Sequence, residues 1–540
     1  MNSHSSVLSL CTSLLICAAS TLVTRTALLA QTSPSLSPAS LPGVFTYHND
    51  NFRTGQNLLE TILTLANVNS STFGKLISYP VDGLVYAQPL YAPSVKIPGK
   101  GVHNVVYVAT EHDSVYAFDA DGLSSGPLWH RNFTNPKTGL TTIPAADTGG
   151  GLVGPEIGIT STPVINASTG TIYVVAATKS KAGVYAQRLH ALSITTGAEK
   201  IGARLITATI RANGDSSKAG VLIFSPLHQL QRAALLLAGG LIYIAFASHE
   251  DVDPYHGWVF AYSVAGLARA AVFNDTPDGA RGGIWQAGNG PAADLDGNVF
   301  VASGNGTFDA DSGGLDYGDS LIELVRSRSK LLVSDYFTPR NEATMAANDL
   351  DFGSSGPILL PERFPGPAHL AIVGDKSGTL YVIDRDHLGG FTPSGDQIIQ
   401  ELASEFSQGL FSTPAYYNNR MYFGPIGNPL VSFALSGGQL QTANIALSSH
   451  TFEFPGATPS ISANGSGNAI VWAIDSSAYS SGGPAVLYAF DASNLNELYD
   501  STQAGSRDLA GPAVKFTVPT VANGKVYVGT QSELDVYGLL

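Results

Sequence analysis

The chain has 540 residues, a net charge of −14 and only 13% charged residues. An acidic surface repels phosphate backbones and anionic lipid headgroups, so nucleic acids and membrane surfaces are poor partners. The 58 glycines and 30 prolines indicate a turn-rich β protein rather than a helical one.

The first thirty residues predict a signal peptide. An apolar run extends from Val7 to Ala30, interrupted only by Arg25, and the polar Ser/Pro linker 31–42 follows it. A retained membrane anchor is the alternative, which the absence of a cationic cluster after the run disfavours. No later stretch reaches the roughly 18 uninterrupted apolar residues of a membrane span. We expect a secreted or periplasmic protein with a single domain over residues 43–540.

Both cysteines, Cys11 and Cys17, lie in this leader. Its removal would leave a chain without cysteine, which excludes disulfides, thiolate nucleophiles and cysteine metal sites from the mature protein. The loss of Arg25 would change the net charge from −14 to −15.

One short apolar strand recurs eight times at a spacing of roughly 60 residues, which indicates a repeat architecture. The copies are 105–109, 171–175, 241–245, 298–302, 370–374, 420–424, 469–473 and 525–529. A strand that often carries Thr-Pro precedes each copy, and a third and a fourth strand follow it. Polar turns such as Asn523-Gly524 join the first two strands, which is a strong hairpin signal.

Four short antiparallel strands repeated eight times predict an all-β, eight-bladed propeller. Two packed β-sandwiches are the alternative, but the copies follow one another without a linker. The last copy ends at Leu540 after three strands, so a fourth strand must come from elsewhere. We expect residues 73–79 to supply it and close the ring, because an open edge would invite aggregation.

The repeats carry a family likeness. The segment 115–120 with Gly126 and Trp129, the segment 487–492 with Tyr499, and the segment 374–384 resemble the pyrroloquinoline quinone (PQQ) repeat. The resemblance implies that an aromatic residue following a Gly turn locks neighbouring blades together. Quinoprotein alcohol dehydrogenases share this ring, and so do non-catalytic scaffolds of the outer-membrane assembly type, so the likeness predicts fold and not function.

The sequence departs from those dehydrogenases at the cofactor. The family places PQQ between a Trp and a ring formed by two adjacent cysteines, beside a calcium ion held by Glu and Asn or Asp, with an Asp as base. The mature chain would have no cysteine, and no stretch allows the calcium ligands or the base to be assigned. PQQ and calcium therefore remain without identifiable ligands, and the catalytic residues remain unassigned.

Polar residues gather in one set of loops, those between second and third strands and those between successive blades. Antiparallel topology places these loops on one face of the ring, as a ligand mouth requires. The candidate ligand-face residues are His112, Asp113, His249, Asp251, His256, Trp258, Trp285, Asp309, Asp311 and Asp351.

Two of these loops suggest a metal. His249, Asp251 and His256 could ligate one beside a stacking Trp258, although a solvated loop is the favoured interpretation. In that interpretation the two histidines affect stability little. The loop Asp309–Asp319 offers oxygen ligands, but its spacing matches no known calcium loop. Asp294 and Asp296 belong to a hairpin turn on the opposite face.

Two functions remain open. The first is a non-catalytic extracytoplasmic module that binds a protein, a glycan or a small molecule through the loop-rich face. The second is a PQQ- and calcium-dependent dehydrogenase with a cysteine-free pocket. Missing cysteines and unassigned calcium ligands favour the first.

Overall fold

The computed structural model describes residues 43–151, 153–363 and 366–540. The predicted signal peptide and linker lie outside these residues. Within them, no helix is long and apolar enough to span a bilayer.

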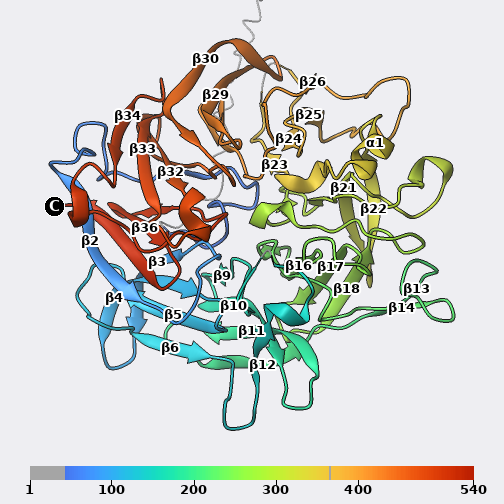
Figure 1. Ribbon diagram of the computed structural model, residues 1–540, viewed down its shortest axis with the longest axis horizontal. Helices are drawn as coiled ribbons and strands as arrows, with labels where there is room; N and C mark the ends of the chain where they lie inside the picture. Colours follow the sequence, from blue (N-terminus) through green and yellow to red (C-terminus); the bar gives the residue numbers. More distant parts are fainter. Residues whose placement is uncertain (1–42, 152, 364–365) are drawn as a thin grey trace, which may run out of the picture. The chain divides into compact units, whose positions relative to one another are not determined.

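Eight antiparallel sheets follow one another along the chain, and Figure 1 shows them arranged as a ring. Blade 1 consists of β3 (Leu90–Ile97), β4 (Gly101–Ala109), β5 (Ser114–Asp119) and β6 (Trp129–Asn132), and blade 2 of β9 (Val164–Asn166), β10 (Thr171–Lys179), β11 (Tyr185–Ser193) and β12 (Glu199–Leu205). Blade 3 consists of β15 (Leu236–Ala238), β16 (Leu241–Phe246), β17 (Trp258–Ser263) and β18 (Arg269–Asn274), and blade 4 of β19 (Ala292–Ala293), β20 (Val299–Ala302), β21 (Leu321–Ser327) and β22 (Lys330–Phe337).

Blade 5 consists of β23 (Ile358–Leu359), β24 (Leu370–Gly374), β25 (Leu380–Asp384) and β26 (Gln400–Leu402), and blade 6 of β27 (Ala415–Tyr417), β28 (Arg420–Phe423), β29 (Asn428–Ser436) and β30 (Gln439–Phe452). Blade 7 consists of β31 (Ser460–Asn464), β32 (Gly467–Asp475), β33 (Val486–Asp491) and β34 (Glu497–Asp500), and blade 8 of β35 (Thr520–Ala522), β36 (Lys525–Gly529), β37 (Glu533–Leu539) and β2 (Phe73–Pro80). First strands of neighbouring blades contact one another from β9 to β23 and from β27 round to β3, which places them at the centre. The predicted eight-bladed propeller is confirmed.

Two hairpins and one short helix add to the eight blades. The hairpin β7 (Thr141–Pro144) and β8 (Glu156–Ile157) extends the sheet of blade 2 through β10. The hairpin β13 (Thr209–Arg211) and β14 (Val221–Ile223) forms a sheet of its own. The short helix α1 (Glu342–Ala347) lies between blades 4 and 5 in the sequence.

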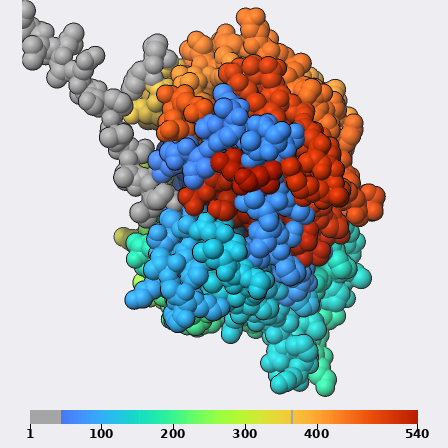
Figure 2. All heavy atoms as spheres, turned by 90° about the vertical axis from the view of Figure 1, so that its left-hand side faces the viewer, coloured from blue at the N-terminus to red at the C-terminus, as the bar shows by residue number. Residues whose placement is uncertain are grey.

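The ring closes as expected. Strand β2 pairs antiparallel with β37, from Phe73 opposite Leu539 to Pro80 opposite Glu533. Figure 2 shows this blue N-terminal segment beside the red C-terminal strands. Tyr79 then links blade 8 to blade 1, because its hydroxyl donates to the Asp119 carbonyl oxygen at 2.6 Å.

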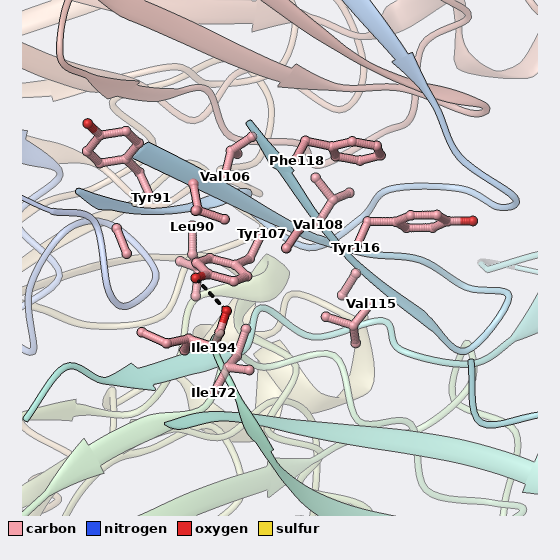
Figure 3. Close-up of a cluster of buried hydrophobic side chains, with 14 of the residues drawn as sticks. Leu90, Tyr91, Val106, Tyr107, Val108, Val115, Tyr116, Phe118, Ile172 and Ile194 are labelled. Carbon is pink, nitrogen blue, oxygen red and sulfur yellow. Dashed lines mark hydrogen bonds between the residues drawn. The ribbon is translucent and has the colours of Figure 1, made fainter. Parts of the chain in front are cut away.

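Aromatic side chains also join blades 1 and 2, as the family likeness implies. The Tyr107 hydroxyl donates to the Ile194 carbonyl oxygen at 3.0 Å, the bond drawn in Figure 3, and the Trp129 indole N–H donates to the same oxygen at 2.8 Å. Gly197 has φ +69°, and a Cβ there would lie 2.5 Å from the Trp129 ring. Only glycine fits this turn beneath the indole.

One central feature escaped the sequence analysis: the segment 44–57 hydrogen-bonds to the first strand of every blade. The backbone of Val44 pairs with Tyr91, and the carbonyl oxygens of the segment accept from the backbone N–H groups of Ile165, Ala293, Leu359, Tyr416 and Ile461. The side-chain amides of Asn51 and Asn57 donate to the carbonyl oxygens of Leu237 and Val521, each at 2.9 Å. The segment ends as β1 (Gln56–Asn57), which runs parallel to β31.

We call residues 44–57 the channel segment, and Arg53 anchors it. Its side chain is fully buried, and its five N–H donors all have acceptors. These are the carbonyl oxygens of Tyr47, Leu235 and Pro291 and the hydroxyl of Thr46, so the guanidinium binds neutral dipoles rather than a carboxylate. Burial lowers its pKa to about 10, which leaves it charged at neutral pH.

Replacing Arg53 with Met should destabilise the ring. The change keeps most of the apolar stem but leaves three buried carbonyl oxygens without donors, and each orphaned group costs about 1–3 kcal/mol. We expect the free energy of unfolding, measured by urea denaturation, to fall by about 3 kcal/mol or more. The matched variant Arg211→Met, at an exposed position of β13, should change it by less than about 0.5 kcal/mol. Equal effects of the two changes would contradict the anchoring role.

Candidate ligand-binding site

A cavity of about 360 Å³ opens among the loops of the predicted ligand face. It is lined by the β16–β17, β20–β21 and β24–β25 loops and by connections that lead into blades 4 to 8. We call this cavity the central pocket. Its volume falls in the range of small-molecule sites.

An ion pair forms the polar side of the central pocket. The Lys376 ammonium contacts the Asp351 carboxylate and lies 2.8 Å from Asp349 Oδ1. Asn305 fixes both acids, because its backbone N–H donates to Asp351 Oδ1 and its side-chain amide donates to Asp349 Oδ1, each at 2.7 Å. Asn305 Oδ1 is buried without a partner among the described residues.

Burial and attraction compete in this ion pair. Burial raises the pKa of Asp351, and the neighbouring Lys376 ammonium opposes that shift. Burial alone would lower the pKa of Lys376, but the attraction of Asp351 and Asp349 outweighs it and the pKa is raised. The lysine is therefore a cation held at the pocket wall.

Asp251 adds a third carboxylate to the lining. The hydroxyls of Ser248 and Tyr255 donate to its Oδ1, at 3.0 and 2.6 Å. Glu250 also lines the cavity and accepts from the backbone N–H of Gly151.

Four aromatic rings form the apolar side. The Trp285 ring lies edge-to-face with Phe516, at 5.1 Å between centroids, and with Phe411, at 6.1 Å. Phe454 completes the wall at 6.0 Å from Phe411 and 5.9 Å from Phe516, and it is 38% exposed. An apolar face and an ionic edge therefore meet across one cavity.

Three of the predicted ligand-face residues, Asp251, Trp285 and Asp351, line the central pocket. His112 lies elsewhere, paired with Glu156 at 3.0 Å. Asp113 is fully buried beside Glu111, and burial holds its pKa well above the usual range. Asp309 accepts from the backbone N–H of Asp316 and so braces its own loop. Asp311 lies in the same loop, on its short 3-10 turn, outside the pocket lining.

His249, His256 and Trp258 differ from expectation. His256 is 2% exposed, and its ring nitrogens bond the carbonyl oxygens of Thr276 and Asp215 at 3.0 and 2.9 Å. His249 is 5% exposed, and burial lowers its pKa to about 4. Trp258 lies in the blade 3 core against Phe224 and Phe260, where no ligand can stack on it. The solvated-loop interpretation of these histidines is wrong.

The metal expectation for these loops finds no support in the geometry. Within residues 43–151, 153–363 and 366–540, no group of three or more His, Cys, Asp or Glu side chains is placed to hold an ion. Asp294 has the expected structural role, because its carboxylate accepts from the backbone N–H groups of Asp296 and Asn298 in the β19–β20 turn.

The sequence analysis missed Lys376, Asn305 and the three phenylalanines of the wall. Their signal lies in the repeat register: Asn305 and Lys376 each follow the second strand of a blade by two or three residues. Phe411, Phe454 and Phe516 precede the first strands of blades 6, 7 and 8. Aligning the copies by strand would have placed all five on the ligand face.

The chain is an eight-bladed β-propeller whose fold matches that of quinoprotein alcohol and methanol dehydrogenases. The quinohemoprotein alcohol dehydrogenase of Comamonas testosteroni superposes with a TM-score of 0.62 at 15% identity, covering 92% of this chain and 80% of that one. A europium-containing methanol dehydrogenase gives 0.60 at 14% identity, covering 93% and 99%. No family model and no curated protein sequence matches the chain. At these identities the likeness shows the fold alone.

Replacing His256 with Ala should destabilise blade 3, since it opens a cavity and removes the ring between the carbonyl oxygens of Thr276 and Asp215, one of which accepts from its N–H. We expect the free energy of unfolding to fall by about 2 kcal/mol. His369 is the matched control, because it is half-exposed and pairs with the exposed Asp386. His369→Ala should cost less than about 1 kcal/mol. If both variants unfold at the same denaturant concentration, His256 has no structural role.

Proposed function

We propose that the protein is an extracytoplasmic binding propeller whose central pocket takes a small ligand with one flat apolar face and one polar edge. The observation that carries the proposal is the meeting of four aromatic rings with the Asp351–Lys376 pair across a single cavity. Aromatic walls favour planar ligands through dispersion and edge-to-face contacts.

The polar edge supports one orientation of such a ligand. Lys376 offers a charged donor, and charge-assisted hydrogen bonds are the strong ones in binding sites. Asp251 and Asp351 offer acceptors on the same side, while Asn305 holds Asp351 in place. A ligand would lie with its flat face on Trp285 and its heteroatoms toward Lys376.

PQQ serves as a flat, polar-edged probe of this proposal, with binding measured by isothermal titration calorimetry. We expect binding by the unmodified protein, and Lys376→Met should weaken it about tenfold or more, since losing a charged hydrogen bond costs about 1.5–3 kcal/mol. Trp285→Leu should weaken it too. Lys525→Met, which removes a lysine paired with Asp121 outside the pocket, should leave it unchanged. Identical affinities of the Lys376 and Lys525 variants would overturn the assignment of the pocket.

A PQQ-dependent dehydrogenase is the second candidate, and one observation favours it: the buried, unpartnered Asn305 Oδ1 lies beside two carboxylates in the same pocket. The aromatic wall and Lys376 fit a tricyclic quinone. The residues fit calcium less well, because Asp351 already contacts the Lys376 ammonium and no group of three ligating side chains is present within the described residues. Calcium requires six to eight oxygen ligands.

Calcium dependence separates the two candidates. A binding propeller should take up PQQ equally well in calcium and in EDTA, and should not reduce an electron-accepting dye when primary alcohols are added. The measurements are calorimetry and dye absorbance on one preparation. Calcium-dependent binding together with alcohol-dependent dye reduction would instead establish the dehydrogenase.

A further inference from the structure

A second cationic site lies beside the central pocket, at Lys515. This residue belongs to the connection from blade 7 to blade 8, and its side chain is 8% exposed. Within the described residues, its ammonium makes no hydrogen bond and no ion pair with a carboxylate. It lies over two aromatic faces, with Nζ 4.9 Å from the ring centroid of Tyr479 and 5.8 Å from that of Phe516.

The ammonium borders a cavity of about 320 Å³ that is distinct from the central pocket. Tyr86, Tyr479 and Gln531 supply polar side chains to its lining together with Lys515. The segment Val514–Phe516 separates the two cavities, since Lys515 lines this one and Phe516 lines the other. We call it the Lys515 cavity.

A second buried cation lies next to this cavity. The Arg232 guanidinium lies 5.7 Å from the centroid of the Tyr86 ring, which lines the cavity. Among the described residues, its hydrogen bonds go only to the carbonyl oxygens of Thr160, Ala287 and Phe516. Of the nearby acids, Glu111 has its pKa raised to about 7 by burial, and Glu250 attracts the Lys515 ammonium without forming an ion pair with it.

A buried ammonium without a carboxylate in direct contact is unusual, because buried charges in proteins are paired. Attraction to aromatic faces recovers only part of the cost of removing the charge from water. Burial accordingly lowers the pKa of Lys515. An anion in the cavity would complete the pairing, and the Tyr86 and Tyr479 rings that line the cavity would contact a flat group attached to it.

We propose that the Lys515 cavity binds the carboxylate of a small aromatic acid, with the carboxylate on the ammonium and the ring against Tyr479. This site is independent of the ligand proposed for the central pocket. Lys515 is the cation of this site, and Lys376 is the cation of the central pocket.

Benzoate is the probe, and benzyl alcohol is its neutral counterpart of similar shape. Calorimetry on the unmodified protein should show benzoate binding at least tenfold tighter than benzyl alcohol. Lys515→Met should weaken benzoate binding tenfold or more with the fold retained in a thermal melt, and Lys376→Met should leave benzoate affinity within twofold.

Three results would overturn the proposal: no benzoate binding, equal binding of benzyl alcohol, or unchanged benzoate affinity in the Lys515 variant. The comparison of the two probes needs no variant, so it decides the question even if Lys515→Met does not fold. Loss of PQQ binding in the Lys376 variant without loss of benzoate binding would separate the two sites.

Discussion

The hydrogen bonding of residues 44–57 to all eight first strands is the interaction on which the rest of the structure depends. A ring of short strands exposes a row of unpaired backbone groups at its centre, and buried polar groups without partners are costly. One extended segment satisfies these groups blade by blade, in chain order. Arg53 then ties the segment to blades 3 and 4 through the carbonyl oxygens of Leu235 and Pro291.

This arrangement positions the candidate sites. The channel segment fills the centre beside the first strands, where Tyr47, His48 and Arg53 are buried. The connections that enter those strands carry Trp285, Phe411, Phe454 and Phe516, so rings from different blades converge over the channel. The second-to-third strand loops supply Asp251, Asn305 and Lys376 from three consecutive blades. The central pocket therefore follows from strand order.

The sequence predicted the features that repeat. Eight copies of one strand revealed the blades, and the missing fourth strand after Leu540 revealed the role of residues 73–79. Features that occur once were harder to predict. The channel segment has no second copy, and its partners are up to several hundred residues away.

The candidate site was partly predictable for the same reason. Asp251, Trp285 and Asp351 were identified because the alternation of connections fixes their face. His256 looked like a solvated ligand, since nothing near it in sequence shows that Asp215 and Thr276 cover its ring. Trp258 is the first residue of strand β17. An error of one residue in the predicted start of a strand therefore moves a side chain from the core to a loop.

Native-state hydrogen exchange tests the central claim most directly. Six first-strand amides donate to the channel segment: those of Tyr91, Ile165, Ala293, Leu359, Tyr416 and Ile461. If the segment is an integral part of the ring, these amides should exchange only through global unfolding, as slowly as the amide of Val526 in the core strand β36. Exchange of these six amides at the rate of exposed loop amides, while Val526 stays protected, would contradict the account.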